Sequence, residues 1–205
     1  MAEDNSVMVV AVLAVIASLA AAGVSYYSAV SVVPKISGYA TGTANLTIET
    51  SAVINFSDAL INWQSGRVNV NKDKAFLDTY AGSVVDGNWT VENTGLKIEN
   101  IGNVNVTLAL TAGKSATTFI GGTSPAYKWR VNNSEAGSCV NATNSTYGWE
   151  GFADVNTTTG GTRFCSLFQF LTSTNSVRID INLTVPYDST KGALGDIITA
   201  TATAI

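Results

Sequence analysis

The chain has 205 residues, of which 46% are hydrophobic and only 13% charged, and its formal net charge is -4. A negative net charge argues against a nucleic-acid-binding protein, because such proteins neutralise phosphates with a basic surface. The sequence has no histidine and two cysteines, which excludes histidine acid-base catalysis and a Cys/His zinc site. Its length suits one domain, or one domain with an extension.

The first predicted element is an uncharged apolar segment, Val7–Val33, which is soon followed by Lys35. As a helix, this segment would extend about 40 Å at ~1.5 Å per residue. It is therefore longer than a helix of roughly 20 residues, which is enough to cross a bilayer. Pro34 marks its end, because the residue before a proline is disfavoured in the helical conformation. We therefore expect a hydrophobic N-terminal helix at residues 1–34 and an extracellular β-sandwich domain at residues 35–205.

Three interpretations of the apolar segment compete: a cleavable secretory signal, a single membrane anchor, and a helix that packs against copies of itself. Ala20–Ala22 offers a signal cleavage site, but Glu3 and Asp4 stand where a signal peptide carries positive charge. A row of small residues favours packing, because small side chains let helices approach closely. This helix-packing stripe consists of Ala11, Ala14, Ser18, Ala21, Ser25 and Ser28. Two alternatives stay open, since alanine is common in any apolar helix and the valines between Val7 and Val12 also suit a strand.

The remainder of the chain predicts β-structure. Segments with alternating or β-branched side chains recur between turns rich in Gly, Asn, Asp and Ser, and a helical turn is expected only near Phe76–Tyr80. The expected strands are Ala44–Ile48, Val53–Phe56, Arg67–Val70, Trp89–Glu92, Lys97–Asn100, Val104–Leu110, Tyr127–Val131, Phe164–Leu171, Val177–Val185 and Ile197–Thr203. Many short strands with turn signals indicate a sandwich. The predicted fold class is therefore α+β, a long N-terminal apolar α-helix followed by an all-β immunoglobulin-like sandwich.

Large aromatic side chains are expected to form the core of this sandwich, because they bury the most apolar surface. They are Trp63, Trp89, Trp129, Trp149, Phe164, Phe168 and Phe170. The alternative for this part of the chain is that Trp149 or Tyr147 forms an exposed contact on the loop.

Cys139 and Cys165 are the only cysteines in the chain. In an exported domain, an even number of cysteines predicts a disulfide, which here would close a loop rich in Gly, Asn and Thr. Chain-entropy arguments give such a cross-link about 3–4 kcal/mol of stabilisation. The alternative is a pair of buried free thiols.

Asn-x-Ser/Thr sequons recur along the β part of the chain. An occupied sequon requires a surface position and an exported protein. The candidate N-glycosylation sites are Asn45, Asn55, Asn88, Asn105, Asn132, Asn141, Asn144, Asn156 and Asn182. We expect several of them to be occupied, most readily Asn132, Asn141, Asn144 and Asn156. The alternative is an unmodified β surface that is rich in Thr and Asn.

No motif in the sequence points to catalysis. The chain lacks a nucleophile-elbow serine motif, a phosphate-binding loop and a dinucleotide fingerprint, and its carboxylates are spread singly. Asp86–Asn88 suits a hairpin turn better than a calcium loop. We therefore expect no enzymatic activity, no cofactor, no metal and no nucleic-acid partner.

The apolar sequence Val7–Val24, leading into a strand-rich domain with many Asn and Thr residues after Pro34, resembles the archaeal type IV pilin superfamily, which includes adhesive pilins and archaellins. The resemblance implies a subunit that is stored in the membrane, cut by a dedicated peptidase and bundled through its helix at the axis of a helical filament. It implies three partners: identical subunits, the membrane before assembly, and the pilus assembly machinery. One departure is Asn5, which stands where many bacterial pilins carry glutamate.

These observations predict a structural subunit of an extracellular, cell-surface filament that polymerises through its N-terminal helix and serves adhesion or motility. If the amine of Met1 is free, Glu3 or Asp4 would neutralise it on a neighbouring subunit and help to set the register. The alternative is an adhesin or envelope glycoprotein that the same helix anchors in the membrane. A secreted β-sandwich enzyme or carbohydrate-binding module is the least favoured interpretation, because no convergent polar site is visible.

Overall fold

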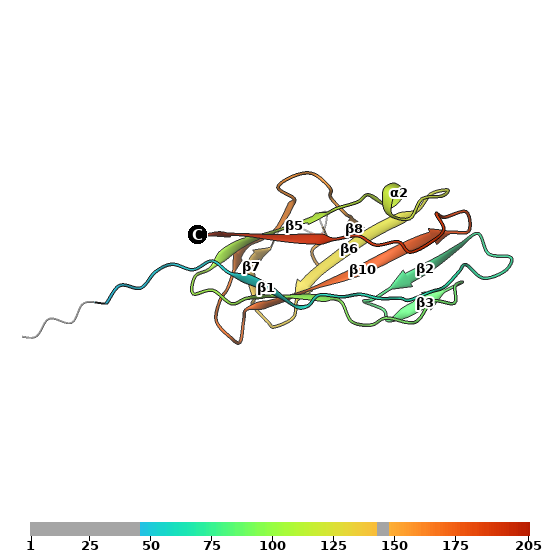
Figure 1. The fold of residues 1–205 in the computed structure, drawn as a ribbon. Helices are drawn as coiled ribbons and strands as arrows, with labels where there is room; N and C mark the ends of the chain where they lie inside the picture. The colour runs from blue at the N-terminus through green and yellow to red at the C-terminus, as the bar shows by residue number, and fades with distance from the viewer. Residues whose placement is uncertain (1–45, 143–147) are drawn as a thin grey trace, which may run out of the picture. The chain divides into compact units, whose positions relative to one another are not determined.

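The structure is a computed structural model that describes residues 46–142 and 148–205 (Figure 1). Residues Ile48–Ile205 form one compact unit. Its elements in chain order are β1 (Ile54–Asp58), β2 (Lys74–Asp78), β3 (Ser83–Val85), β4 (Leu96–Asn100), β5 (Val106–Ala112), α2 (Ala116–Phe119), β6 (Ala126–Asn133), β7 (Cys139–Ala142), β8 (Ala153–Asp154), β9 (Thr162–Phe168), β10 (Ser176–Pro186) and β11 (Ile198–Ala204).

The larger sheet is built around β10, and its strand pairs are antiparallel. β6 runs along one edge of β10. Two strands share the other edge end to end: β4 pairs with Ser176–Ile179, and β2 pairs with Asn182–Pro186. β1 lies outside β4, β3 outside β2, and β8 outside β6. The long central strand thus joins two halves of the sheet that have different neighbours.

The smaller sheet has the order β11-β5-β9-β7. β5 pairs with β11 without interruption, from Ala112 opposite Ile198 to Val106 opposite Ala204. Successive residues of β5 alternate between buried and half-buried, because neighbouring side chains of a strand point to opposite faces. The buried residues of this strand, which are Val106, Leu108, Leu110 and Ala112, therefore point into one core.

The two sheets pack face to face over that core. The ring of Trp129 in β6 meets the ring of Phe164 in β9 edge-on, with 5.3 Å between the ring centroids. Phe168 from β9 and Ile98 and Ile179 from the larger sheet are fully buried beside them. Trp63, Trp89 and Trp149 are half-buried and pack against the same cluster. The described part of the chain is therefore a β-sandwich, and the prediction of an aromatic core is confirmed for Trp129, Phe164 and Phe168.

The predicted α+β fold class is wrong. The described residues form two antiparallel sheets and only one single-turn helix, α2, which Ser115 caps. No helix in residues 46–142 and 148–205 is long and apolar enough to cross a membrane. The long helix predicted at residues 1–34 lies outside the described residues. The immunoglobulin-like arrangement is also wrong, since two strands share one edge of β10 and the disulfide joins neighbouring strands of one sheet instead of the two sheets.

Three short segments between residues 67 and 92 differ from their predicted local structure, and residues 46–48 of the predicted strand Ala44–Ile48 are not in a strand either. Arg67–Val70 makes only an isolated bridge, between Val68 and Gly87, and Trp89–Glu92 is not a strand. The residues predicted as a helical turn near Phe76 instead belong to β2, which buries Ala75 and Leu77. Each of these segments is short, so its neighbours in space decide its conformation.

The chain enters β1 through a clasp formed by Asn103. The side-chain amide of Asn103 donates a hydrogen bond to the carbonyl of Glu49 (2.7 Å) and accepts one from the backbone N–H of Ser51 (2.7 Å). The backbone N–H of Asn103 also donates to the carbonyl of Ser51 (2.9 Å). Gly102 permits this approach, because a Cβ there would lie 2.2 Å from the Ser51 carbonyl oxygen.

Candidate functional site

An apolar groove of about 1370 Å³ lies on the core side of the larger sheet. Its walls are segment 59–68, which follows β1, and segment 187–198, which leads from β10 into β11 (Figure 1). Of the smaller sheet, only Ile198 lines the groove. The groove therefore occupies the part of the sandwich where two loop segments, instead of paired strands, face the larger sheet.

The floor of the groove comes from the inward faces of four strands of the larger sheet. It is formed by Leu77 of β2, Leu96 of β4, Tyr127 of β6, and Ile181, Leu183 and Val185 of β10. All of these side chains are buried. The floor follows from the alternation of β10, whose odd-numbered apolar residues face the core.

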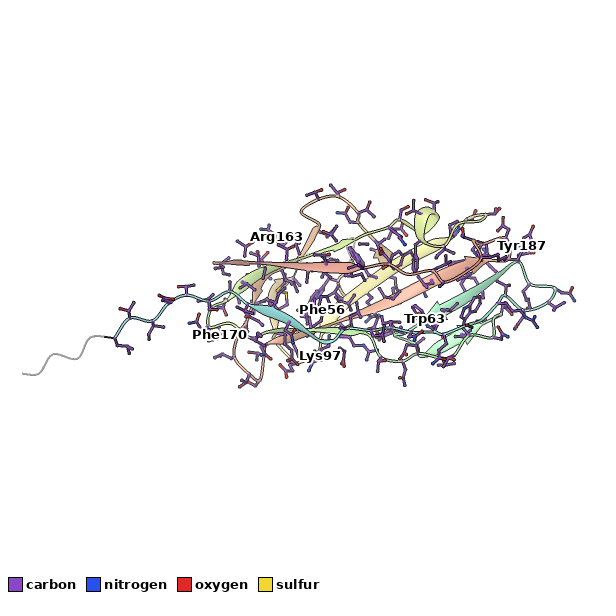
Figure 2. All side chains as sticks on the ribbon, viewed as in Figure 1. Phe56, Trp63, Lys97, Arg163, Phe170 and Tyr187 are labelled. Atoms are coloured by element: carbon purple, nitrogen blue, oxygen red, sulfur yellow. A yellow bond between two sulfur atoms is a disulfide. The ribbon has the colours of Figure 1, made fainter. Side chains whose placement is uncertain are left out.

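Aromatic side chains line the walls. Figure 2 labels Phe56, Trp63 and Tyr187 among them. The ring of Phe119 lies 5.0 Å from the ring of Tyr127. Trp89 lies so close to Gly66 that a Cβ there would be 2.3 Å from the indole ring. These rings offer apolar contact, whereas polar residues of the same two segments, among them Gln64, Arg67 and Lys191, also line the groove.

The rim of the groove is apolar and faces solvent. Leu60 on one wall is 72% exposed, and Ile197 on the opposite wall is 76% exposed. Leu194 and Tyr187 are also exposed on the second wall. Large apolar side chains gathered around a groove are typical of a binding surface.

Specific contacts hold the second wall in place. Asp188 accepts hydrogen bonds from the backbone N–H and the hydroxyl of Thr123, at 2.9 Å and 2.7 Å, and these bonds lower the pKa of Asp188. Thr190 N–H donates to the carbonyl of Ile120 (2.9 Å), and Lys114 Nζ donates to the carbonyl of Gly195 (2.5 Å). The wall is thus fixed at both ends, which favours a preformed groove.

Tyr127 is the perturbed titratable group in the groove. Burial, followed by the charge of Asp196 and a hydrogen bond with it, raises the pKa of Tyr127. One carboxylate oxygen of Asp196 is buried without a hydrogen-bond partner. In the described residues, no group of three or more His, Cys, Asp or Glu side chains could hold a metal ion.

A buried ion pair lies outside the groove, where β2 and β4 meet along β10. Arg178 donates to one oxygen of Asp180 from Nε (2.9 Å) and from its terminal nitrogen (2.7 Å). The hydroxyl of Thr79 donates to the same oxygen at 3.0 Å, and Asp180 is fully buried. Gly95 leaves the space for this group, because a Cβ there would be 2.8 Å from the Asp180 oxygen. These contacts join the two halves of the sheet and explain the pair without a ligand.

The predicted disulfide between Cys139 and Cys165 is confirmed. It joins β7 to β9 in the smaller sheet, with 5.7 Å between the two Cα atoms. The disulfide therefore fixes the edge strand β7 to its neighbour β9.

The structure separates the candidate glycosylation sites by exposure. Asn55, Asn88 and Asn141 are exposed; Asn105, Asn132, Asn156 and Asn182 are half-buried; Asn45 and Asn144 lie outside the described residues. The side-chain nitrogen that would carry the sugar donates to Asp78 in Asn182 (2.9 Å) and to Thr162 in Asn156 (3.1 Å). The exposed sites are therefore the better candidates, so Asn132 and Asn156 rank lower than the sequence suggested.

The predicted helix-packing stripe and the predicted register charges lie outside the described residues. They are Ala11, Ala14, Ser18, Ala21, Ser25 and Ser28, and Glu3 and Asp4. Sequence reasoning did not find the groove. Its only sequence signal is the occurrence of large apolar residues, Leu60 and Leu194, in segments that otherwise have the composition of loops.

Comparison with known proteins adds no relative. No family model matches the chain, and neither a curated protein nor a solved structure matches it.

Proposed function

We propose that this protein is a structural subunit of an extracellular, type IV pilus-like helical filament, used for adhesion or motility. The observation that carries the proposal is the uncharged apolar segment Val7–Val33 in the same chain as a disulfide-bonded β-sandwich. An apolar segment of this length must be buried in lipid or in protein. Burial among identical copies removes it from water after it leaves the membrane, and heterologous contacts between copies extend without closing.

Two properties of the domain support an outer, extracellular position. A disulfide persists in oxidising compartments, which include the cell surface. Three sequons, at Asn55, Asn88 and Asn141, present exposed asparagines. Sugars on these residues would keep the filament surface soluble, while the membrane and the assembly machinery would act on the apolar segment before polymerisation.

Electron microscopy of the assembled chain tests the proposal. The full-length chain, purified in detergent and then freed of it, should form regular filaments under negative stain. Replacing Ala14 and Ala21 with leucine puts large side chains into the helix-packing stripe and should block assembly. The matched control replaces Ala17 and Ala20, which lie off the stripe, and should leave filaments intact.

The same experiment distinguishes the filament from the alternative, a membrane-anchored adhesin or envelope glycoprotein. Single molecules that stay bound to detergent or lipid, with no polymer at any concentration, would overturn the filament. The register hypothesis has its own test, in which alanines at Glu3 and Asp4 should impair assembly. Normal filaments from that double variant would refute the register role.

A glycopeptide map tests the surface assignment. Mass spectrometry of the chain isolated from its native cells should find sugar on Asn55, Asn88 and Asn141 more often than on Asn156 and Asn182. The physical reason is access to the amide nitrogen. Equal occupancy of the two groups, or sugar on none of them, would contradict the assignment.

A further inference from the structure

We propose that the groove receives an extended segment, residues 40–48, from a second copy of this chain, which adds a strand to the free edge of β11. The inference goes beyond the proposed filament, because it concerns contacts between β domains and not the apolar N-terminal segment. It rests on two features of one molecule that complement each other: an open acceptor edge and a segment whose sequence has strand character.

The acceptor is the seam between the edges of the two sheets. Within residues 46–142 and 148–205, β11 pairs with β5 on one side only, so its other edge offers backbone N–H and carbonyl groups to a further strand. Across the groove lie Phe56 of the edge strand β1 and the exposed Leu60. Ile198, Ala200 and Ala202 of β11 pack inward, so the strand edge is continuous with the apolar floor.

The donor segment has the period-two pattern of a half-buried strand. Its even positions are small or apolar, and most of its odd positions carry threonine. The even positions are Ala40, Gly42, Ala44, Leu46 and Ile48; the odd ones are Thr41, Thr43, Asn45 and Thr47. Leu46 and Ile48 are 84% and 77% exposed in the described part, where residues 46–50 form no strand. A segment with this alternation satisfies its backbone and its apolar face only by joining a sheet.

The chemistry of the two partners matches. Residues 36–48 carry no charge, so burying them leaves no unpaired ion in the groove. Nine extended residues span about 30 Å, comparable to the roughly 23 Å of β11 plus the groove beyond it. The buried indole N–H of Trp63 has no acceptor in the described residues, and an added strand brings backbone carbonyls to that wall.

The alternation is also compatible with the sequon at Asn45, which lies in the donor segment. In the added strand, Leu46 and Ile48 would face the floor, and Asn45 and Thr47 would face outward. A sugar on Asn45 would therefore be compatible with insertion. The occupant is a second copy because the clasp on Glu49 and Ser51 fixes the chain just beyond the donor segment, and Leu46 and Ile48 of the same chain remain exposed.

Mixed cross-linking tests the inference directly. One full-length chain carries Leu46→Cys and an affinity tag, and a second carries Ile198→Cys or Leu60→Cys; both are produced without glycosylation and mixed in detergent. Oxidation should give a disulfide-linked heterodimer. Two controls change only the face: Thr47→Cys on the donor and Thr199→Cys on the outer side of β11 should cross-link at least about tenfold less, because each neighbouring residue points the opposite way.

A second measurement uses charge to block insertion. The Leu46→Asp/Ile48→Asp variant should weaken association of the domains at least about tenfold, measured by light scattering in detergent, as expected for losing two buried aliphatic groups. Thr43→Asp/Thr47→Asp carries the same charge on the other face and should associate normally. Equal behaviour of the two variants would overturn the inference.

The outcomes separate this inference from the filament. Filaments without the heterodimer would overturn the seam contact and leave the filament proposal standing. Heterodimers without filaments would do the reverse. A chain with both Leu46→Cys and Ile198→Cys that cross-links only within itself would show that the occupant is its own segment, which also overturns the contact between copies.

Discussion

The inner face of the larger sheet is covered in different ways in the two halves of the sandwich. In one half, β5 and β9 of the smaller sheet cover the larger sheet, and Trp129, Phe164 and Phe168 fill the space between them. In the other half, β10 and β2 extend past the smaller sheet, and loop segments 59–68 and 187–198 leave a groove. Both halves share one continuous strand, β10, so the difference arises from what covers its inner face.

This difference indicates how stability and interaction are divided. A closely packed, closed core contributes to stability, because interlocking side chains there lose water completely. A half that loops cover contributes less, and it keeps apolar surface available for a partner. The following experiments test that division, beginning with the largest expected effect.

Truncating one aromatic ring in each half should give different losses. Phe164→Ala in the closed half should lower the free energy of unfolding by about 3–5 kcal/mol, because it leaves a cavity in the buried core. Phe119→Ala in the groove wall should cost about 1–2 kcal/mol, mainly its contact with Tyr127. Urea denaturation of both variants measures this; equal losses would show that the groove half is as firmly packed as the closed half.

Removing the disulfide tests the closed half by another route. Replacing Cys139 and Cys165 with alanine should cost about 3.5 kcal/mol, the chain entropy regained by freeing a loop with a sequence separation of 26. Thermal unfolding with and without reductant provides the control, since reduction should reproduce the loss in the native chain only. A small loss of stability both in the alanine variant and in the reduced native chain would mean that fixing β7 to β9 contributes little to stability.

The ion pair tests the junction between the halves. Arg178→Met should cost about 3 kcal/mol, because Asp180 would be left as a buried charge without its cation. Arg178→Met/Asp180→Leu should recover much of that loss. The matched control is Lys72→Met, which breaks the exposed pair with Asp86 and should cost less than about 1 kcal/mol. Equal losses of stability in Arg178→Met and Lys72→Met would show that the Arg178–Asp180 pair contributes little to the coupling between the two halves.

The groove half has a specific response to pH. The pKa of Tyr127 is raised above its ordinary value of 10.0, so the folded chain holds that proton more tightly than the unfolded chain. The stability it contributes is complete below pH 10 and is lost as the pH rises above it, by at most about 1.4 kcal/mol per pH unit. Denaturation curves between pH 9 and 11 should show this fall, and Tyr127→Phe should reduce it. Tyr187→Phe, at an exposed residue, should leave it unchanged.

The sequence predicted what depends on local periodicity. β5 and β10 were found because their apolar residues alternate over seven or more positions, and the disulfide followed from the cysteine count. β2 was missed, since Lys74 and Asp78 bound a stretch of only five residues and the alternation of Ala75 and Leu77 is too brief to recognise. Exposure of the sequons depends on which face of a strand is covered, and only the packed sheets determine that.

The groove was beyond sequence reasoning for a related reason. Its walls are two loop segments far apart in the chain, and neither has a pattern of its own. Trp89 was expected in a strand because aromatic and β-branched residues surround it. In the structure, Thr90 instead bonds to the carbonyl of Trp63, and this part of the chain helps to line the groove. Contacts between distant loops determine such a site.

The Asn103 clasp has a mechanical consequence. Any tension that passes from the residues before Glu49 into the domain enters at the bonds that Asn103 makes with Glu49 and Ser51, and then reaches the ladder between β1 and β4. The ladder hydrogen bonds lie perpendicular to the strands, so a pull along β1 loads them together in shear instead of one after another. Asn103→Ala would remove its two side-chain bonds, and the force would then act first on the backbone bonds that join Ser51 and Val53 to Asn103 and Ile101.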